Sequence, residues 1–144
     1  MSQGKSGWIN LLKMEPGKNE LEWETSTVPQ DGQEVTFNWL HGVGFSCWNT
    51  SADHRQRMTL QLNGKDLLKC TLDVSDREWT VTGGGATLRY RGLGFSKIES
   101  SGLMSLTVPR SLLNPGLPNC IKLVGQIGED RSGWNGIIET SSLK

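Results

Sequence analysis

The sequence has few cysteines and no long apolar run, and each shortage excludes a class of protein. Its 144 residues include three cysteines, Cys47, Cys70 and Cys120, which are too few and too scattered for a disulfide framework or a zinc site. No segment approaches the roughly 18 apolar residues of a membrane helix. We therefore expect no membrane span. No signal-peptide pattern opens the chain, and the N-terminus does not indicate a cellular location.

The sequence also lacks an excess of charge and the common catalytic motifs. Lysine and arginine number 15 and aspartate and glutamate number 15, so the net charge is zero. Because proteins that bind nucleic acids in general carry a basic excess, we expect no nucleic-acid partner. No nucleophile elbow, Walker-type loop or metal-binding histidine pair occurs. The Gly83-Gly84-Gly85 run is no phosphate cradle, because no helix follows it.

Short alternating segments and 18 glycines are what the sequence does contain. Val35, Phe37 and Trp39 alternate with Thr36 and Asn38, and this period of two predicts a strand with one buried face over residues 34–40. Comparable segments cover residues 7–14, 21–26, 58–62, 65–72, 79–82, 86–91, 103–108, 120–126 and 134–140. Short strands at this spacing predict one all-β domain over residues 1–144, a two-sheet antiparallel β-sandwich of the jelly-roll type.

Turn residues separate these segments. Asn63-Gly64 predicts a type I′ hairpin turn between two strands. Residues 83–85 predict a second hairpin, and residues 111–116 predict a single helical turn followed by a loop.

Several segments also occur in an order that is typical of one family. They are residues 23–27, residues 35–39, the Asn63-Gly64-Lys65 hairpin, residues 106–109 with 114–116, residues 122–125 and residues 131–136. Together, within residues 20–140, they resemble the accessory jelly-roll (galactose-binding-like) carbohydrate-binding modules of bacterial glycoside hydrolases and polysaccharide lyases.

The resemblance implies a non-catalytic role. A module of this kind recognises a polysaccharide or oligosaccharide and brings a linked catalytic domain of the same chain to it. It implies a secreted or cell-surface protein, and we expect a monomer that needs no cofactor.

Sugar rings present apolar C–H faces and a rim of hydroxyl groups, so a binding site needs an aromatic plate beside forked hydrogen-bonding side chains. We expect residues 41–55 to form a loop, kinked at Gly42 and Gly44, that carries His41. Candidate ligand-binding residues in this loop are Trp48, Asn49, His54 and Arg55. The alternative for Trp48 is that it anchors the loop on the sandwich.

Two further places suit a glycan. Arg89 and Arg91 project from one face of a predicted strand, and Leu88 and Tyr90 occupy the other. Arg131 stands three residues before Trp134 in a predicted loop and strand start. For each arginine the alternative is a solvated charge or a weak surface ion pair, and for Trp134 the alternative is packing.

Three other tryptophans and two of the cysteines are expected in or near the interior. Trp23 and Trp39 share strand faces with apolar neighbours, so we expect both in the core, and Trp79 in the core or at its edge. Cys70 and Cys120 lie in apolar segments and are expected to be buried free thiols.

Two other functions remain open from the sequence. The first is a structural or protein-interaction sandwich domain of a larger secreted enzyme, in which every tryptophan is core. The second is a small polysaccharide lyase or hydrolase. His41, Ser51, Asp53 and His54 offer nucleophile and base chemistry, but all four lie in one predicted loop, which does not hold catalytic geometry well.

A structural calcium ion is an option at two acidic segments. Asp73, Asp76 and Glu78 supply hard oxygen ligands, and so do Glu129 and Asp130. No EF-hand pattern is present, and a solvated acidic turn is the interpretation that we favour.

Overall fold

The computed structural model describes residues 12–14, 20–25, 33–45, 55–73, 75–95, 99–125 and 133–141. Side chains are described within residues 20–25, 33–42, 57–73, 75–94 and 100–125. The elements are β1 (Leu12–Met14), β2 (Glu20–Glu24), β3 (Glu34–Phe45), β4 (Arg55–Leu62), β5 (Lys65–Asp73), β6 (Glu78–Gly83), β7 (Ala86–Phe95), β8 (Glu99–Pro109), the 3-10 helix η1 (Arg110–Leu112), β9 (Cys120–Gly125) and β10 (Gly133–Ser141).

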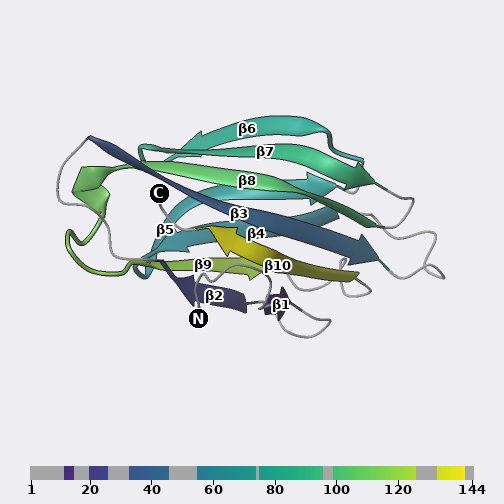
Figure 1. The fold of residues 1–144 in the computed structure, drawn as a ribbon, viewed down its shortest axis with the longest axis horizontal. Helices are drawn as coiled ribbons and strands as arrows, with labels where there is room; N and C mark the ends of the chain where they lie inside the picture. Colours follow the sequence, from purple (N-terminus) through teal and green to yellow (C-terminus); the bar gives the residue numbers. More distant parts are fainter. Residues whose placement is uncertain are drawn as a thin grey trace.

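The strands form two packed antiparallel sheets (Figure 1). The large sheet has the order β1-β10-β3-β8-β7-β6, and the small sheet has the order β2-β9-β4-β5. The pairs β1–β10, β2–β9 and β3–β8 are nested in the sequence and alternate between the sheets. This nesting is how a long hairpin rolls into a jelly roll, and the predicted all-β sandwich is confirmed.

Every second residue of the paired strands faces the space between the sheets. The core contains Leu21, Trp23, Val35, Phe37, Trp39, Met58, Leu60, Leu62, Leu68, Cys70, Leu72, Ala86, Leu88, Tyr90, Met104, Leu106, Val108, Leu113, Ile121 and Leu123. Trp23 of the small sheet meets Trp39 of the large sheet edge-to-face, with ring centroids 5.1 Å apart and planes at 69°. The core positions of Trp23 and Trp39 are confirmed, as is the partly buried position of Trp79.

Both predicted hairpin turns are present. Asn63 and Gly64 have φ values of 51° and 86°, the left-handed pair that a type I′ turn requires. Gly84 and Gly85, at 58° and 87°, form the equivalent turn between β6 and β7. Each turn fixes the register of its hairpin and therefore decides which residues of β5 and β7 face outward.

One end of the sandwich is organised by the buried side chain of Asn119. Its Oδ1 accepts hydrogen bonds from Asn114 N at 2.9 Å and Asn63 Nδ2 at 2.8 Å, and its Nδ2 donates to the carbonyls of Leu117 and Asn114. Thr25 Oγ1 accepts from Asn119 N at 3.0 Å. Asn119 thus joins the loop after η1 to the β4–β5 turn, and the helical turn expected within residues 111–116 corresponds to η1 and the turn after it.

The bounds predicted for the loop over residues 41–55 are wrong at both ends. β3 continues to Phe45, and β4 already begins at Arg55. Gly42 and Gly44 do not end β3, because β3 is a central strand: both glycines pair with β8 on one side and with β10 on the other. Ladder hydrogen bonds on both sides hold these glycines in the sheet, although glycine alone disfavours a strand.

The expectation for the two cysteines is confirmed for one and wrong for the other. Cys70 is buried in the core, whereas Cys120 is half-buried on the outward side of β9. Ile121 and Leu123 take the inward positions of β9, so the alternation of the strand places Cys120 on the other face.

Candidate functional site

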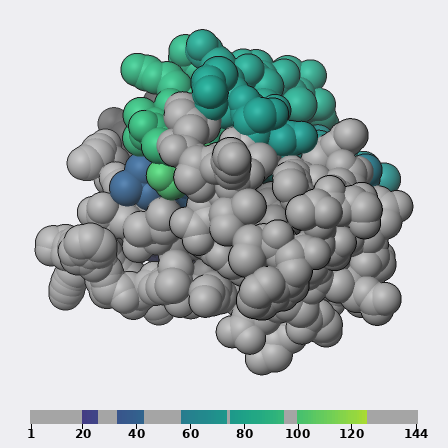
Figure 2. Space-filling model, turned by 90° about the vertical axis from the view of Figure 1, so that its right-hand side faces the viewer, coloured from purple at the N-terminus to yellow at the C-terminus, as the bar shows by residue number. Residues whose placement is uncertain are grey.

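The outward face of the large sheet carries mostly short hydroxyl and amide side chains. Its described positions on β3, β8, β7 and β6 include Glu34, Thr36, Asn38, Leu40, Ser101, Leu103, Ser105, Thr107, Thr87, Arg89, Arg91, Glu78, Thr80 and Thr82. We call this set the hydroxyl face. Figure 2 shows atoms of the β6–β8 region (teal and green) adjoining those of β3 (blue) on one side of the molecule.

Strand register arranges these side chains in rows across the sheet. Thr36 pairs with Thr107, Thr107 with Thr87 and Thr87 with Thr82, so four threonines occupy one row across four strands. Neighbouring strands are about 4.8 Å apart, so a ligand lying across the strands meets one hydroxyl from each strand in turn.

Hydrogen bonds between β3 and β8 fix part of this face. Thr36 Oγ1 and Thr107 Oγ1 are 2.8 Å apart, and Ser105 Oγ donates to Asn38 Oδ1 at 2.7 Å. Each hydroxyl oxygen still has lone-pair capacity after such a bond. The side chains are therefore held in place while they retain the ability to bind a polar ligand.

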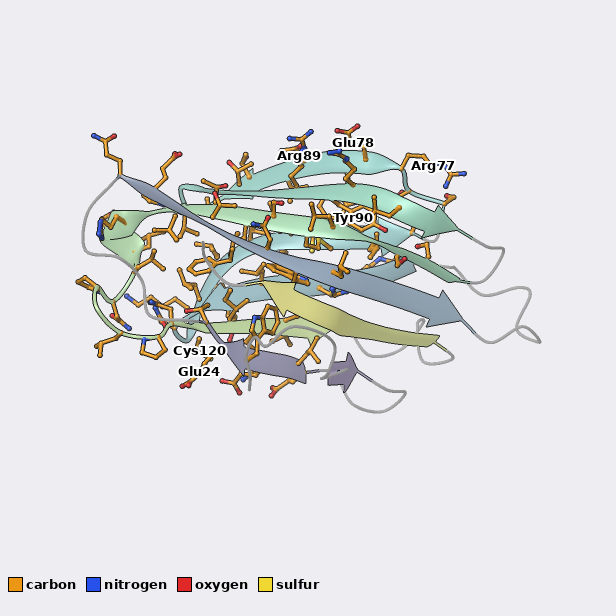
Figure 3. All side chains as sticks on the ribbon, viewed as in Figure 1. Glu24, Arg77, Glu78, Arg89, Tyr90 and Cys120 are labelled. Atoms are coloured by element: carbon orange, nitrogen blue, oxygen red, sulfur yellow. The ribbon has the colours of Figure 1, made fainter. Side chains whose placement is uncertain are left out.

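The two arginines of β7 lie on the outward face, as predicted, but in different electrostatic settings. Arg89 Nη2 donates to Glu78 Oε2 at 3.1 Å, and Figure 3 shows these two side chains together at the edge of the sheet. In the part of the chain that the structure describes, no hydrogen bond or ion pair of Arg91 is found. Both arginines are exposed, so Arg91 is the cation available to a ligand.

Apolar atoms lie beside Arg91. Leu103 pairs with Arg91 on one side and with Leu40 on the other, and both leucines are half-buried. Leu93, two residues along β7, is 62% exposed at the irregularity between Gly92 and Gly94. Such aliphatic positions suit the C–H face of a sugar ring beside groups that bind its hydroxyls.

Most of the other candidates lie outside the described residues. This holds for Trp48, Asn49, His54 and Arg131. Arg55 and Trp134 are described only in their backbone: Arg55 pairs with Asp73 at the start of β4, and Trp134 pairs with Gly44 of β3. Arg91 and Trp134 therefore belong to the same sheet, whereas Arg55 belongs to the other.

The small sheet has a different outward face, with several charged residues on β2 and β9. β2 exposes Glu20, Glu22 and Glu24, and Lys122 of β9 lies 3.3 Å from Glu20. Cys120 Sγ donates to Glu22 Oε2 at 2.9 Å. Figure 3 shows Cys120 beside Glu24 on this side of the sandwich, away from Arg89.

Cys120 is a poor nucleophile in this setting. Its pKa is raised from 9.0 to about 12, first by burial and then by the hydrogen bond to Glu22 and the charges of Glu22 and Glu24, while the charge of Lys122 acts in the opposite direction. Because the thiolate is the reactive form, Cys120 is held as an unreactive thiol at neutral pH.

The carboxylates of the acidic turn between β5 and β6 accept hydrogen bonds from neighbouring residues of the chain. No group of three metal-ligating side chains occurs among the described residues. Asp76 Oδ2 accepts hydrogen bonds from Asp73 N at 2.9 Å and Trp79 Nε1 at 2.8 Å, and Asp73 Oδ1 accepts from the backbone and hydroxyl of Ser75. The calcium option at Asp73, Asp76 and Glu78 is thus replaced by a hydrogen-bonded turn, and Glu129 and Asp130 lie outside the described residues.

A buried polar group lies between the sheets near the ends of β3 and β7. Trp39 Nε1 donates to Nδ1 of the fully buried His41 at 3.0 Å, so His41 is a core residue rather than a loop residue. Burial raises the pKa of Tyr90. The nearby Ser100 hydroxyl lowers this pKa in part, and the charge of Asp76 raises it further. Among the described residues, neither Tyr90 Oη nor Ser100 Oγ makes a hydrogen bond.

This burial separates Tyr90 from the two arginines. Tyr90 is fully buried and faces the core, where Trp79 stacks on it with ring centroids 5.4 Å apart, while Arg89 and Arg91 face outward. The arrangement of a tyrosine base beside an arginine, which a lyase would use, is not formed by these three residues, as the alternation of the strand predicted.

Sequence reasoning identified Arg89 and Arg91 but missed the hydroxyl and amide residues around them. Thr36, Asn38, Ser105 and Thr107 each occupy an outward position in an alternating segment, which is also the pattern of any solvated strand. Only the register between β3 and β8, two strands far apart in the sequence, reveals that they adjoin.

Comparisons with known proteins do not identify the chain. No family model matches it, and no curated protein matches its sequence. A solved structure of the Clostridium perfringens CspB protease is similar over 91% of this chain and 25% of the protease chain, with a TM-score of 0.40 and 7% identity. The chain thus spans about a quarter of that protein, and similarity at this level is too low to indicate a shared function.

No helix among the described residues has the length and apolarity of a membrane span.

Proposed function

We propose that this chain is a non-catalytic carbohydrate-binding module that recognises a polysaccharide through the hydroxyl face of its large sheet. It would bring a linked carbohydrate-active domain of a secreted or cell-surface protein to that polysaccharide. The observation that supports the proposal is the contrast between the two outward faces. The large sheet presents fixed, short hydrogen-bonding groups, whereas the outward positions of β2 and β9 in the small sheet include the charged residues Glu20, Glu22, Glu24 and Lys122.

The physical argument concerns what a sugar needs. A polysaccharide offers many hydroxyl groups, so its binding surface gains from hydrogen-bond donors and acceptors that are already positioned. The Thr36–Thr107 and Ser105–Asn38 pairs are positioned in this way. Long charged side chains would lose more conformational freedom on binding.

The loop candidates give the site a second part. Trp48, Asn49, His54, Arg55, Arg131 and Trp134 remain candidate contacts, although only the backbones of Arg55 and Trp134 are described. Phe45, at the end of β3, pairs with Gly133, at the start of β10, so the segments that continue from these two residues start from neighbouring strands of the large sheet. In the proposal, an aromatic residue from these segments stacks on a sugar that the hydroxyl face holds by hydrogen bonds.

Affinity electrophoresis tests the proposal against neutral, uronate-containing and sulfated polysaccharides. The central variant is Ser105→Ile, which removes a hydroxyl from the middle of the hydroxyl face and breaks the bond to Asn38. The matched control is Thr59→Ile on the outward face of the small sheet. Isoleucine favours strands at both positions, so the fold should be retained.

We expect at least one polysaccharide to retard the wild type and the control but not the Ser105 variant. Retardation that Ser105→Ile leaves intact and Trp48→Ala abolishes would restrict the site to the loops and contradict the role of the sheet. Absence of retardation by every glycan would favour a structural or protein-interaction domain. Release of shortened chains from a bound glycan would favour a lyase or hydrolase.

A further inference from the structure

The two arginines of the hydroxyl face differ in whether a carboxylate pairs with them, and this difference affects which kind of polysaccharide the face would bind. Glu78 is directly opposite Arg91 in the β6–β7 register, yet its carboxylate pairs with Arg89 across the diagonal. The described outward positions of β3, β6, β7 and β8 hold two carboxylates, Glu78 and Glu34. Glu34 is at the start of β3 and pairs with Pro109, whereas Arg91 pairs with Leu103. Among the described residues, the positive charge of Arg91 therefore has no carboxylate partner, although the net charge of the whole chain is zero.

From this arrangement, and resting on the proposed function, we infer that the preferred ligand is an anionic polysaccharide whose carboxylate or sulfate group binds Arg91. A guanidinium presents a planar fork of N–H donors that matches two oxygens of such a group. A neutral glycan would leave this fork without an anionic partner.

The surroundings of Arg91 strengthen the inference. Leu103 and Leu40 continue its row across β8 and β3, so this side of Arg91 is apolar and carries no competing carboxylate among the described residues. A charge pair formed over such a surface is less hydrated than one formed in open solvent, and its attraction is correspondingly larger. The Ser101 hydroxyl, on the next outward position of β8, is available for the sugar that carries the anion.

The structure also predicts opposite effects for two substitutions on adjacent strands. Arg91→Gln removes the cation that binds the anion. Glu78→Gln removes the partner of Arg89 and leaves two unpaired guanidinium groups on β7. Binding of an anionic polysaccharide should therefore weaken in Arg91→Gln and strengthen in Glu78→Gln.

The test uses pairs of polysaccharides that share a backbone. Dextran sulfate is compared with dextran, and polygalacturonate with its methyl ester, with dissociation constants measured by isothermal titration calorimetry at one fixed ionic strength. The control is Lys69→Gln, which removes the same charge from the exposed outward side of β5 on the other sheet. Arg91→Lys keeps the charge but not the planar fork.

We expect the protein to bind one anionic member at least about tenfold more tightly than its neutral partner, as one charged hydrogen-bonded pair would give. Arg91→Gln should remove that preference, Arg91→Lys should restore it only in part, and Glu78→Gln should increase the affinity several-fold. Lys69→Gln should change little. Preferential binding of dextran sulfate would indicate a sulfate ligand, and preferential binding of polygalacturonate would indicate a uronate.

Other outcomes separate this inference from the proposed function. Equal binding to charged and neutral partners, or equal losses in the Arg91 and Lys69 variants, would overturn the anionic preference while the carbohydrate-binding role stood. Failure to bind any of these chains or the wider panel would overturn both.

Discussion

The ring of Tyr90 on β7 lies directly against the backbone of Gly102 on β8. A Cβ atom at position 102 would lie 2.6 Å from both Cε1 and Cζ of the ring and 2.5 Å from the carbonyl oxygen of Arg91. Glycine is the residue that lets β7 and β8 keep this contact. Because Tyr90 and Arg91 are consecutive, the same contact on the buried side sets the position of Arg91 on the outward side.

Gly102→Ala should therefore destabilise the protein and displace Arg91. Overpacking of this kind costs about 1–3 kcal/mol, and the Arg91 carbonyl is backbone that yields little. Urea unfolding would measure the loss of stability, and glycan binding should weaken in the same variant.

Gly94→Ala is the matched control for that experiment. An added Cβ there would meet Ser101 Oγ at 3.2 Å, a side-chain atom that can move slightly. We expect a clearly smaller loss. Similar unfolding midpoints for the two variants would contradict the close packing of Tyr90 on Gly102.

Cys70 should make the protein less stable at alkaline pH. Burial raises its pKa from 9.0 to about 12, so the folded state keeps a proton that the unfolded chain loses above pH 9. The contribution is complete below pH 9 and is lost as the pH rises toward 12, at about 1.4 kcal/mol per pH unit.

Comparison with Cys70→Ala isolates this effect, since the substitution removes the titrating thiol and leaves the other groups unchanged. Unfolding free energies at pH 8 and pH 10.5 should fall more steeply for the wild type than for the variant. Parallel pH dependence in the two proteins would rule out Cys70 as the source.

Asn119→Ala should be among the more damaging polar substitutions. It removes the acceptor of Asn114 N and Asn63 Nδ2 and the donor to two carbonyls inside a buried environment. Leaving such groups without partners costs about 1–3 kcal/mol for each one that water does not reach. Asn114→Ala at an exposed side chain should cost far less, and thermal unfolding of both variants provides the comparison.

The threonine row gives a test of binding that spares the fold. Thr107→Val replaces the hydroxyl that contacts Thr36 by a methyl group of the same shape, and valine favours strands. If the row contacts a glycan, affinity should fall several-fold with an unchanged unfolding midpoint. The control, Thr71→Val on the outward side of β5, should leave affinity unchanged. Equal affinities for the wild type and both variants would exclude a role for Thr107 in binding.

The alternating pattern of the chain was sufficient to predict which face of most strands is buried. Trp39 and Leu88 lie inward and Arg89 lies outward because the side-chain period of a strand is fixed by its backbone geometry. The Asn63-Gly64 turn was equally predictable, since few residue pairs adopt the backbone angles of a type I′ turn.

The same reasoning failed where a strand's neighbours override its local preference. Gly42 and Gly44 indicated a loop, yet β8 and β10 pair with them on both sides. His41 was therefore assigned to a binding loop, whereas it is buried and accepts a hydrogen bond from Trp39. Cys120 was misassigned because its segment is apolar, although its own position faces outward.

By itself, then, the sequence determined the strand periodicity, the hairpin turns and the all-β sandwich, because each depends on residues close together in the chain. The tertiary structure decided that Thr36, Thr107, Thr87 and Thr82 share a row, and that Glu78, which lies opposite Arg91, pairs instead with Arg89. The physical reason is that both features depend on the register between strands, and the register of β3 against β8 is set by core packing between residues about 70 positions apart.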